Sequence, residues 1–310
     1  MKFEQTIKEE AIRLGFDACG ICKAEPVGEQ ADYLRKWLDN RKHADMRFME
    51  NHWAKRTDPS LLMENARSII MLALNYYPLV KREEPLPRFA YFAYGNDYHD
   101  VVKVRLRKLL DFITSSSKKR GQQVSGRVFC DSAPILEKYH GYKAGLGWLG
   151  KNTQLVIPGK GSFFFLGAIL VDIELDYDIP GKDRCGHCRR CIDACPTQAL
   201  EGPHNLNTNK CIAYLTIENK GEIPEEHSRK MGNMVYGCDA CLRACPWNRF
   251  ATPTQIEEFH PSEGFLQLDA EKLNNLTEEE YQNLFQDSSI KRAGYSGLKR
   301  NMAVCKIRLT

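Results

Sequence analysis

The sequence predicts an α+β fold in three parts. Over residues 1–175, short apolar segments alternate with amphipathic segments, a pattern typical of an α/β sandwich. From Asp176 to residue 250 the composition shifts to cysteine, proline and glycine, and residues 251–310 are again mostly helical in pattern. We therefore expect three domains, covering residues 1–175, 176–250 and 251–310.

The elements of the first part follow from the spacing of their apolar residues. Residues 2–14 repeat apolar side chains at helical spacing, and residues 17–22 then form a short candidate strand. The continuous apolar run at residues 68–76 is typical of a buried strand. By the same criteria we expect further helices at residues 33–38, 101–113 and 133–143, further strands at residues 126–130 and 162–175, and a helix in the third part at residues 275–285.

Composition and charge are those of an ordinary soluble protein. The chain is 43% hydrophobic and 27% charged, with a net charge of +4, and its longest apolar run is far shorter than a membrane span. No secretion signal opens the sequence, so we expect a reducing cytoplasm. Residues 290–310 contain basic side chains and no acid, which indicates either a solvated face or a contact with a nucleic-acid backbone. These basic residues are Lys291, Arg292, Lys299, Arg300, Lys306 and Arg308.

Eight cysteines between residues 185 and 245 carry the strongest functional signal. Four form a Cys-x2-Cys-x2-Cys-x3-Cys-Pro run, three more form a shorter Cys-x2-Cys-x3-Cys-Pro run, and one lies between the two runs. The first spacing is that of bacterial ferredoxins, in which three thiolates bind one iron–sulfur cluster and the fourth binds another. Disulfides are unexpected in a chain of this size without a secretion signal, and zinc does not explain the third Cys-x2 step. The sequence therefore predicts two [4Fe–4S] clusters and a role in electron transfer.

The exchange of ligands between the two runs gives each cluster four cysteines. We expect the first cluster on Cys185, Cys188, Cys191 and Cys245, and the second on Cys195, Cys211, Cys238 and Cys241. The alternative for Cys211 is a buried core thiol, which would leave the second cluster with three ligands.

Other candidate sites are weaker on residue chemistry alone. Asp131 lies where a candidate strand gives way to a candidate helix, and an aspartate there is typically an N-cap. The glycine-rich segment 145–152 suits a turn, or a cradle for a large planar or phosphate-bearing ligand. Cys19 and Cys22 are two positions of one strand, which favours packing over redox chemistry. No two histidines stand four residues apart, so a histidine metal site is not expected.

Several long motifs together resemble the epoxyqueuosine reductase family. They are DSAPILEKYHGYKAGLGWLGKNT, GSFFFLGAILVDI, CGHCRRCIDACPTQAL, CIAYLTIE and GCDACLRACPWNRF, and the resemblance covers roughly residues 40–305. It implies an oxidoreductase that converts epoxyqueuosine to queuosine at the wobble position of tRNA. It also implies cobalamin in the N-terminal domain, beside two [4Fe–4S] clusters in a ferredoxin-like domain.

The resemblance also assigns residues to the site. Asp131 matches the proton donor of the family, which reverses the N-cap interpretation, and we expect its carboxyl in a closed apolar pocket. Since no histidine stands out as a cobalt ligand, we expect base-off cobalamin without an axial histidine. The residues placed beside cobalamin are Ala54, Arg56, Asp131, Leu155, Leu166, Ala213, Asp239 and Ala240.

The implied partners are a tRNA anticodon stem-loop carrying epoxyqueuosine and an external low-potential electron donor of the flavodoxin or ferredoxin type, with the protein itself a monomer. Longer family members continue into helical repeats that help to bind tRNA, whereas this sequence ends at Thr310, just past the last matching segment. Phosphate contacts are therefore expected from the basic tail and from the basic residues of segment 103–108.

Two other functions fit part of the pattern. A corrinoid reductive dehalogenase also joins cobalamin to two clusters, but such proteins usually carry an export signal. A ferredoxin-type module that serves a separate catalytic subunit would bind neither cobalamin nor tRNA.

Overall fold

A four-stranded antiparallel sheet forms the body of the first part. The computed structural model describes residues 2–82 and 85–305, and the sheet has the order β1-β2-β7-β4. The strands are β1 (Ala18–Lys23), β2 (Ser68–Asn75), β7 (Phe164–Val171) and β4 (Gly126–Phe129). All eight residues of β2 are buried, because β2 lies between β1 and β7 and both of its faces are covered. This is the burial that its continuous apolar sequence predicts.

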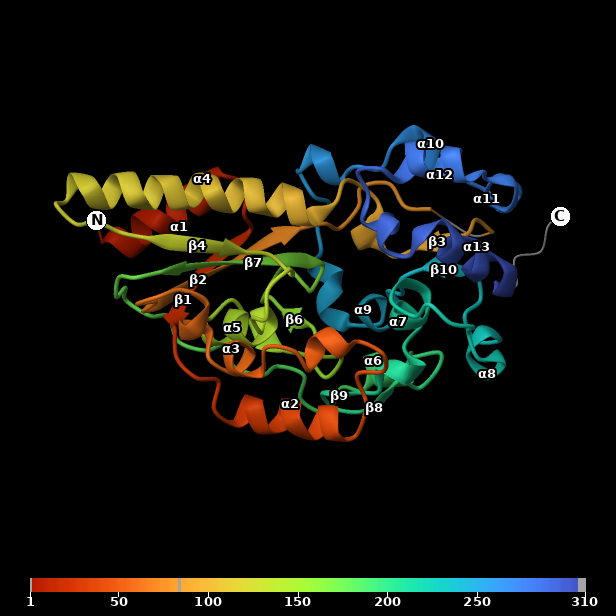
Figure 1. The fold of residues 1–310 in the computed structure, drawn as a ribbon, viewed down its shortest axis with the longest axis horizontal. Coiled ribbons are helices and arrows are strands. Elements are labelled where there is room, and N and C mark those ends of the chain that lie inside the picture. The colour runs from red at the N-terminus through yellow and green to blue at the C-terminus, as the bar shows by residue number, and fades with distance from the viewer. Residues whose placement is uncertain (1, 83–84, 306–310) are drawn as a thin grey trace.

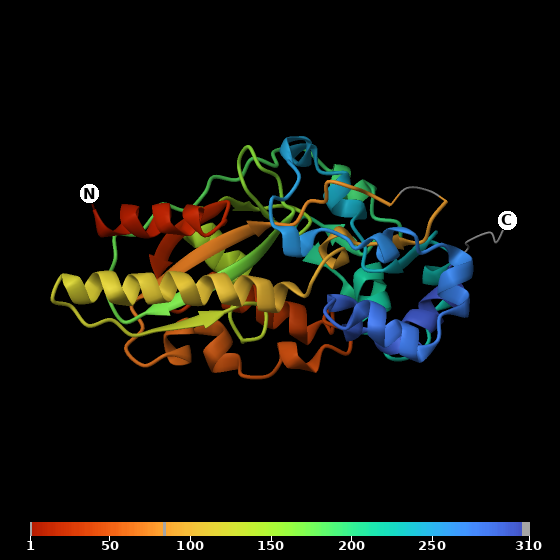
Figure 2. The same ribbon diagram turned by 90° about the horizontal axis from the view of Figure 1, so that it is seen from above.

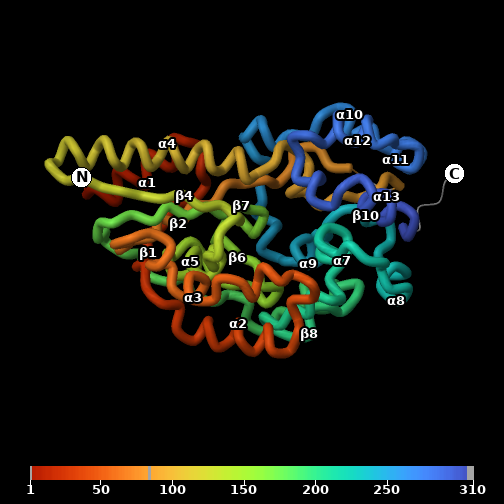
Figure 3. Tube along the Cα trace, viewed as in Figure 1, coloured from red at the N-terminus to blue at the C-terminus, as the bar shows by residue number. Residues whose placement is uncertain are grey.

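Helices cover both faces of this sheet (Figure 1). The helices α1 (Phe3–Arg13) and α4 (Tyr98–Lys119) pack together on one face, and α5 (Glu137–Lys143) packs on the other. Beyond α5 lie α2 (Glu29–Asp39) and α3 (Trp53–Thr57), as Figures 1 and 3 show. The result is a helix–sheet–helix sandwich with one apolar cluster on each side of the sheet.

The cysteine-rich part consists of short elements at one end of the sandwich. Its elements are α6 (Arg190–Asp193), β8 (Leu200–Gly202), β9 (Asn205–Leu206), α7 (Ile212–Ile217), α8 (Glu225–Ser228), β10 (Met234–Tyr236) and α9 (Ala240–Arg243). The two short helices α6 and α9, which carry the two cysteine runs, pack against each other. Strand β3 (Arg88–Phe89), from the first part of the chain, pairs with β10, so the two parts share a small sheet.

The C-terminal part packs on this shared sheet. It contains α10 (Glu263–Leu266), α11 (Ala270–Asn275), α12 (Glu278–Phe285) and α13 (Gly294–Val304). Their apolar side chains join Phe89 and Tyr236 in one core cluster. The N-terminus and this part lie at opposite ends of the long axis of the molecule (Figure 2).

Shorter elements complete the chain. The hairpin of β5 (Trp148–Leu149) and β6 (Leu155–Val156) lies next to α5. The 3-10 helices are η1 (Arg47–Met49), η2 (Pro59–Leu62), η3 (Tyr91–Ala93), η4 (Thr208–Lys210), η5 (Pro246–Phe250), η6 (Glu257–Phe259) and η7 (Ser289–Arg292). Within the described residues, no helix combines the length and apolar character that crossing a membrane requires.

The predicted elements differ from the observed ones mainly in where they begin and end. The expected helix over residues 133–143 begins only at Glu137, and Pro134 disfavours helical backbone at Ala133, the residue before it. Asp131 is therefore not its N-cap, since that position belongs to Leu136. The helix expected over residues 101–113 extends over the whole of α4, β7 is shorter than the expected strand, and residues 251–256 are not helical.

Candidate redox and catalytic site

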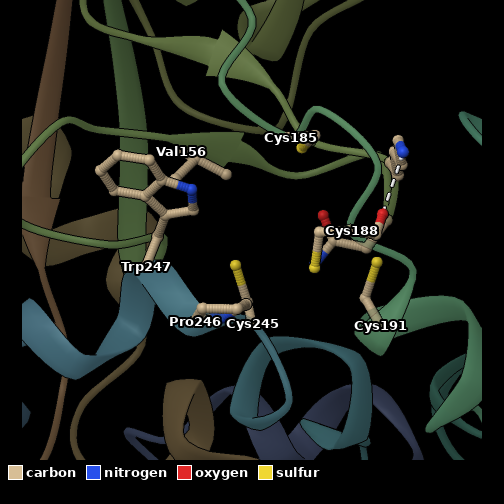
Figure 4. A pocket seen from close by; sticks show the side chains of 10 residues that line it. Val156, Cys185, Cys188, Cys191, Cys245, Pro246 and Trp247 are labelled. Atoms are coloured by element: carbon tan, nitrogen blue, oxygen red, sulfur yellow. Dashed lines mark hydrogen bonds between the residues drawn. The ribbon is translucent and has the colours of Figure 1, made fainter.

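Four of the predicted ligands line one pocket. The sulfur atoms of Cys185, Cys188, Cys191 and Cys245 face a common space, with Trp247 beside them (Figure 4). Local structure holds them there: a turn closed by a 3.0 Å hydrogen bond joins Cys188 to Cys185, Cys191 lies in α6, and Cys245 follows α9. Proline follows Cys245 at the first position of η5, where its missing N–H is tolerated.

Residues of the glycine-rich segment surround this first cysteine group. The indole Nε1 of Trp148 donates to the sulfur of Cys185 at 3.3 Å, and the Lys151 ammonium donates to the carbonyl oxygens of Gly186 and Cys188. A side chain at Gly147 would lie 1.9 Å from the carbonyl oxygen of Val156, so glycine is required there for close approach of the backbone. The segment thus packs the cluster site, a role that its sequence alone did not reveal.

The other four predicted ligands form a second group. Burial raises the pKa of Cys238 to about 12, and it raises the pKa of Cys241 well above the ordinary range, with neighbouring thiols adding to both effects. Cys211 and Cys195 are among those neighbours. Isolated thiols of this kind would stay protonated, so iron must displace their protons on binding. The sulfur of Cys195 accepts a hydrogen bond from the Ala199 amide at 3.2 Å.

Eight thiols in two groups of four fit two iron–sulfur clusters. Over residues 2–82 and 85–305, no three His, Cys, Asp or Glu side chains converge tightly enough to hold a single metal ion. A four-iron cluster holds its thiolates further apart than one ion does. Cys19 and Cys22, by contrast, are core thiols whose pKa burial raises to about 12.

Asp131 lies on the loop after β4. Its backbone adopts φ of +52°, its amide donates to Glu137 Oε1 at 2.7 Å, and its carboxylate accepts a hydrogen bond from the Tyr98 hydroxyl. The side chain is 59% exposed, so the closed apolar pocket that we expected around Asp131 is not observed. The partly buried carboxyl is instead Glu137, whose pKa burial and the nearby Asp131 charge raise to about 8.

Lys138 connects this loop with the second cysteine group. The Lys138 residue is exposed, but loss of water around its ammonium group lowers its pKa. The charges of Asp131, Cys241, Glu137 and Cys211 raise the pKa. The charges of these four groups therefore act on one ammonium group.

Apart from Asp131, the residues predicted to contact cobalamin divide into three sets. Leu155 and Leu166 belong to one apolar cluster of the sandwich, whereas Asp239 and Ala240 line a cavity of about 540 Å³ beside Cys238. Ala54, Arg56 and Ala213 belong to neither the apolar cluster nor the lining of this cavity.

The observed polar groups fit a bound cofactor. Arg56 is buried and donates to the carbonyl oxygen of Phe48 at 2.6 Å, but its Nε has no partner. A buried donor without a partner is costly, so it suits a polar group of a ligand. Asp239 accepts a hydrogen bond from the Tyr91 amide at 2.7 Å, and burial raises its pKa to about 6.

Most of the basic residues predicted to bind phosphate are engaged within the chain. Arg105 pairs with Glu258 at 2.9 Å, Arg292 forms two 2.9 Å hydrogen bonds to Glu218, and Arg300 donates to backbone carbonyl groups. Their solvated face is therefore smaller than the sequence indicates. Lys306 and Arg308 lie outside the described residues.

Comparison with known proteins identifies the family. The 4Fe-4S double cluster binding domain matches residues 184–248, and the family described as "Epoxyqueuosine reductase QueG, DUF1730" matches residues 56–132. The sequence is 46% identical to epoxyqueuosine reductase of Cellulophaga algicola, with 98% of each chain covered. It is 38% identical to that of Escherichia coli, covering 97% of this chain and 79% of the relative. The chain belongs to the epoxyqueuosine reductase family.

Solved epoxyqueuosine reductases share its fold. The crystal structure of epoxyqueuosine reductase with an epoxyqueuosine-modified tRNA-Tyr stem loop superposes with a TM-score of 0.86 at 29% identity, covering 97% of this chain and 80% of the other. The structure of the reductase from Streptococcus thermophilus superposes with a TM-score of 0.88 at 24% identity, covering 98% and 80%. The α+β fold with a double-cluster domain is thereby confirmed.

Proposed function

We propose that this protein reduces epoxyqueuosine in tRNA to queuosine, with two [4Fe–4S] clusters and cobalamin as its cofactors. The observation that carries this proposal is that Glu137, which accepts the amide hydrogen of Asp131, is followed by Lys138, on which the charges of Asp131, Glu137, Cys211 and Cys241 all act. Electrons and protons can therefore both reach a substrate bound near Lys138. In this assignment residues 1–175 hold cobalamin, residues 176–250 hold the clusters, and residues 251–310 support tRNA binding.

The eight cysteines supply the electrons. We assign the first cluster to Cys185, Cys188, Cys191 and Cys245, and the second to Cys195, Cys211, Cys238 and Cys241. Exposed basic residues flank Cys185 and Cys188 of the first group, whereas Cys211 and Cys241 of the second group share the electrostatic surroundings of Lys138, so electrons enter at the first group and leave from the second. When bound, cobalamin supplies a low-potential centre that delivers these electrons to the epoxide carbon.

Asp131 supplies a proton to the oxygen that leaves. Its exposed carboxyl is free to reach a substrate, while the Tyr98 hydroxyl restrains one of its oxygens. Glu137 accepts the amide hydrogen of Asp131 and so holds the loop in its left-handed backbone conformation. Arg56, with its unpaired Nε, and the apolar side chains of Leu155 and Leu166 are the proposed cofactor contacts, together with Ala54, Ala213, Asp239 and Ala240.

The electron donor docks at the surface of the first cluster. Segment 182–193 has four basic and two acidic residues, and Lys182, Arg184, Arg189 and Arg190 are all exposed. A flavodoxin or ferredoxin is acidic and would be attracted to this surface. We expect the R189E/R190E double variant to slow cluster reduction by such a donor and to leave reduction by dithionite unchanged. The matched control is K118E/K119E, at the far end of α4.

The partner on the substrate side is a tRNA anticodon stem-loop carrying epoxyqueuosine, and the enzyme acts as a cytoplasmic monomer. Anaerobically reconstituted protein, supplied with cobalamin, a reductant and epoxyqueuosine-containing tRNA, should form queuosine, detected by mass spectrometry of the nucleosides. D131N should keep both clusters and the corrinoid spectrum, but its turnover should fall by about 100-fold or more.

A protein that carries clusters but binds neither cobalamin nor tRNA would instead be an electron-transfer module. Turnover of halogenated substrates in place of the tRNA would identify a dehalogenase.

A further inference from the structure

The proposed reaction needs more protons than Asp131 carries. Reduction of an epoxide to an alkene and water consumes two electrons and two protons, whereas one carboxyl group delivers one proton. The second proton must therefore come from another group after Asp131 has given up its own. We infer that Asp97 and His99 form a proton relay that reprotonates the Asp131 carboxylate. This inference rests on the proposed function and adds two residues to it.

The geometry of the relay is continuous from α4 to the loop. His99 Nδ1 lies 2.7 Å from Asp97 Oδ1, and His99 Nε2 lies 3.7 Å from Asp131 Oδ2. The ring thus stands between two carboxylates, one on each nitrogen. This is the arrangement in which a carboxylate fixes the tautomer of an imidazole and steadies its charged form, while the other nitrogen exchanges a proton.

The contacts of Asp97 favour its ionised form. Burial acts against its charge, but hydrogen bonds from His99 and Lys291 outweigh that effect and hold the pKa of Asp97 well below its ordinary value. Its Oδ1 also accepts the amide hydrogen of His99 at the start of α4, and its Oδ2 lies 3.0 Å from the Lys291 ammonium. The fixed carboxylate beside Nδ1 holds the ring in the orientation that leaves Nε2 on the side of Asp131.

Neighbouring groups serve other roles. The Tyr98 hydroxyl donates to the same Asp131 oxygen, and burial and the Asp131 charge raise the pKa of Tyr98 far above its ordinary range, so it stays a hydrogen-bond donor. Glu137 bonds to the amide of Asp131 and not to its carboxylate. Charged groups face the relay from α4, α5 and the C-terminal part, namely Asp97, Asp100, Lys103, Glu137, Lys138, Lys291 and Arg292.

The relay step is a simple exchange. After Asp131 has given its proton to the leaving oxygen, the Nε2–H bond of the imidazolium breaks and an O–H bond forms on Asp131 Oδ2. The neutral ring then takes a proton from solvent, which can reach it because the His99 side chain is 33% exposed. The gap of 3.7 Å is longer than a hydrogen bond and has to shorten for direct transfer, as contacts between catalytic groups do when substrate binds.

Packing keeps the ring in place for this exchange. The rings of His99 and Tyr98 stack at 4.2 Å, and the other face of Tyr98 stacks on Phe165 at 4.2 Å with an interplanar angle of 5°. Phe165 belongs to β7, so the relay rests on the central sheet. His99 is accordingly a proton-transfer residue and Asp97 a positioning residue.

The test compares H99A, H99Q and D97N in the reconstituted holoenzyme. H99A and H99Q should lower kcat by about 100-fold and leave KM for the tRNA unchanged, with clusters and corrinoid spectrum intact. D97N should lower kcat less, because it affects only the orientation and charge of the ring. The control is H204Q, a histidine near β9 and far from Asp131 in sequence, which should match the wild type.

Chemical rescue separates proton transfer from a structural role. Added imidazole should restore H99A in proportion to the imidazolium concentration, and should not restore H99Q, whose side chain fills the space. Wild type and H204Q are measured at the same imidazole concentrations, because imidazole also binds cobalt. Wild-type turnover by both His99 variants, or a loss in H99A that imidazole does not relieve, would overturn the relay. If the wild type itself leaves epoxyqueuosine unchanged, it is the proposed function that fails.

Discussion

Replacing Glu137 by glutamine should remove a pH-dependent cost from the folded protein. Burial and the Asp131 charge raise the pKa of Glu137 from 4.5 to about 8. Between these two values the folded protein binds a proton that the unfolded chain does not, so stability falls as the pH rises through this window. Glutamine has no such proton, and its side-chain oxygen can still accept the amide hydrogen of Asp131, which lies 2.7 Å from Glu137 Oε1.

The size of the effect follows from the pKa difference. One pKa unit corresponds to about 1.4 kcal/mol, so the cost of keeping Glu137 in the folded protein reaches about 3 kcal/mol at pH 7 and levels off above pH 8. Solvent that reaches the partly exposed carboxyl reduces this to about 2 kcal/mol. E137Q should therefore be more stable than the wild type at pH 7 and above, and should differ little from it near pH 5.

Two measurements check this reasoning. The denaturant midpoint of E137Q and of the wild type is compared from pH 6 to 9, with E222Q, an exposed glutamate, as the matched control. Infrared spectra over the same range should show a protonated carboxyl band that disappears near pH 8 and is missing from E137Q. A stability difference that does not change with pH, or a wild-type spectrum without that band at pH 7, would refute the assignment.

Three further predictions address the clusters and the C-terminal part. C211S should lose the second cluster and roughly half of the bound iron, whereas C22S should keep all of it; equal iron in both variants would return Cys211 to the core. W148F keeps the ring but removes the hydrogen bond to Cys185, so the potential of one cluster should fall in a redox titration, and an unchanged potential would contradict the contact. N301L leaves two buried backbone carbonyl groups without their 2.8 and 2.9 Å bonds and should cost about 2–4 kcal/mol in denaturant unfolding, which a midpoint equal to that of wild type would disprove.

The sequence predicted the elements whose cause is local. Strand β2 has a continuous apolar run, and α1 has apolar residues at helical spacing, so both could be assigned from pattern alone. The spacing of the two cysteine runs indicates which thiols share a cluster, and this assignment of cluster ligands stays a prediction. The start of α5 could not, because it depends on Pro134 together with the left-handed backbone of Asp131.

The parts of the site that were missed depend on contacts between distant segments. Trp148 reaches Cys185 across 37 positions of sequence, and Lys291 reaches Asp97 across nearly two hundred. His99 was set aside because no second histidine stands four residues away, but its partners are carboxylates and not a metal. The Asp-Tyr-His sequence at the start of a basic helix was the available signal, since an N-cap aspartate followed by a histidine two positions later can bond to the ring.

The basic residues of the C-terminal part explain how the two halves of the site are held together. Lys291 pairs with Asp97 at the start of α4, and the next residue, Arg292, forms a bidentate pair with Glu218 at the end of α7. Element η7 thus connects the helix that carries the proposed relay to the helix that follows Cys211, a proposed cluster ligand. Bidentate arginine–carboxylate pairs are geometrically specific, so this contact fixes orientation as well as distance. The charges that the sequence alone suggested for RNA binding therefore serve first to align the proton-delivering loop with the second cluster, and a phosphate that competed for Lys291 would act directly on the charge of Asp97.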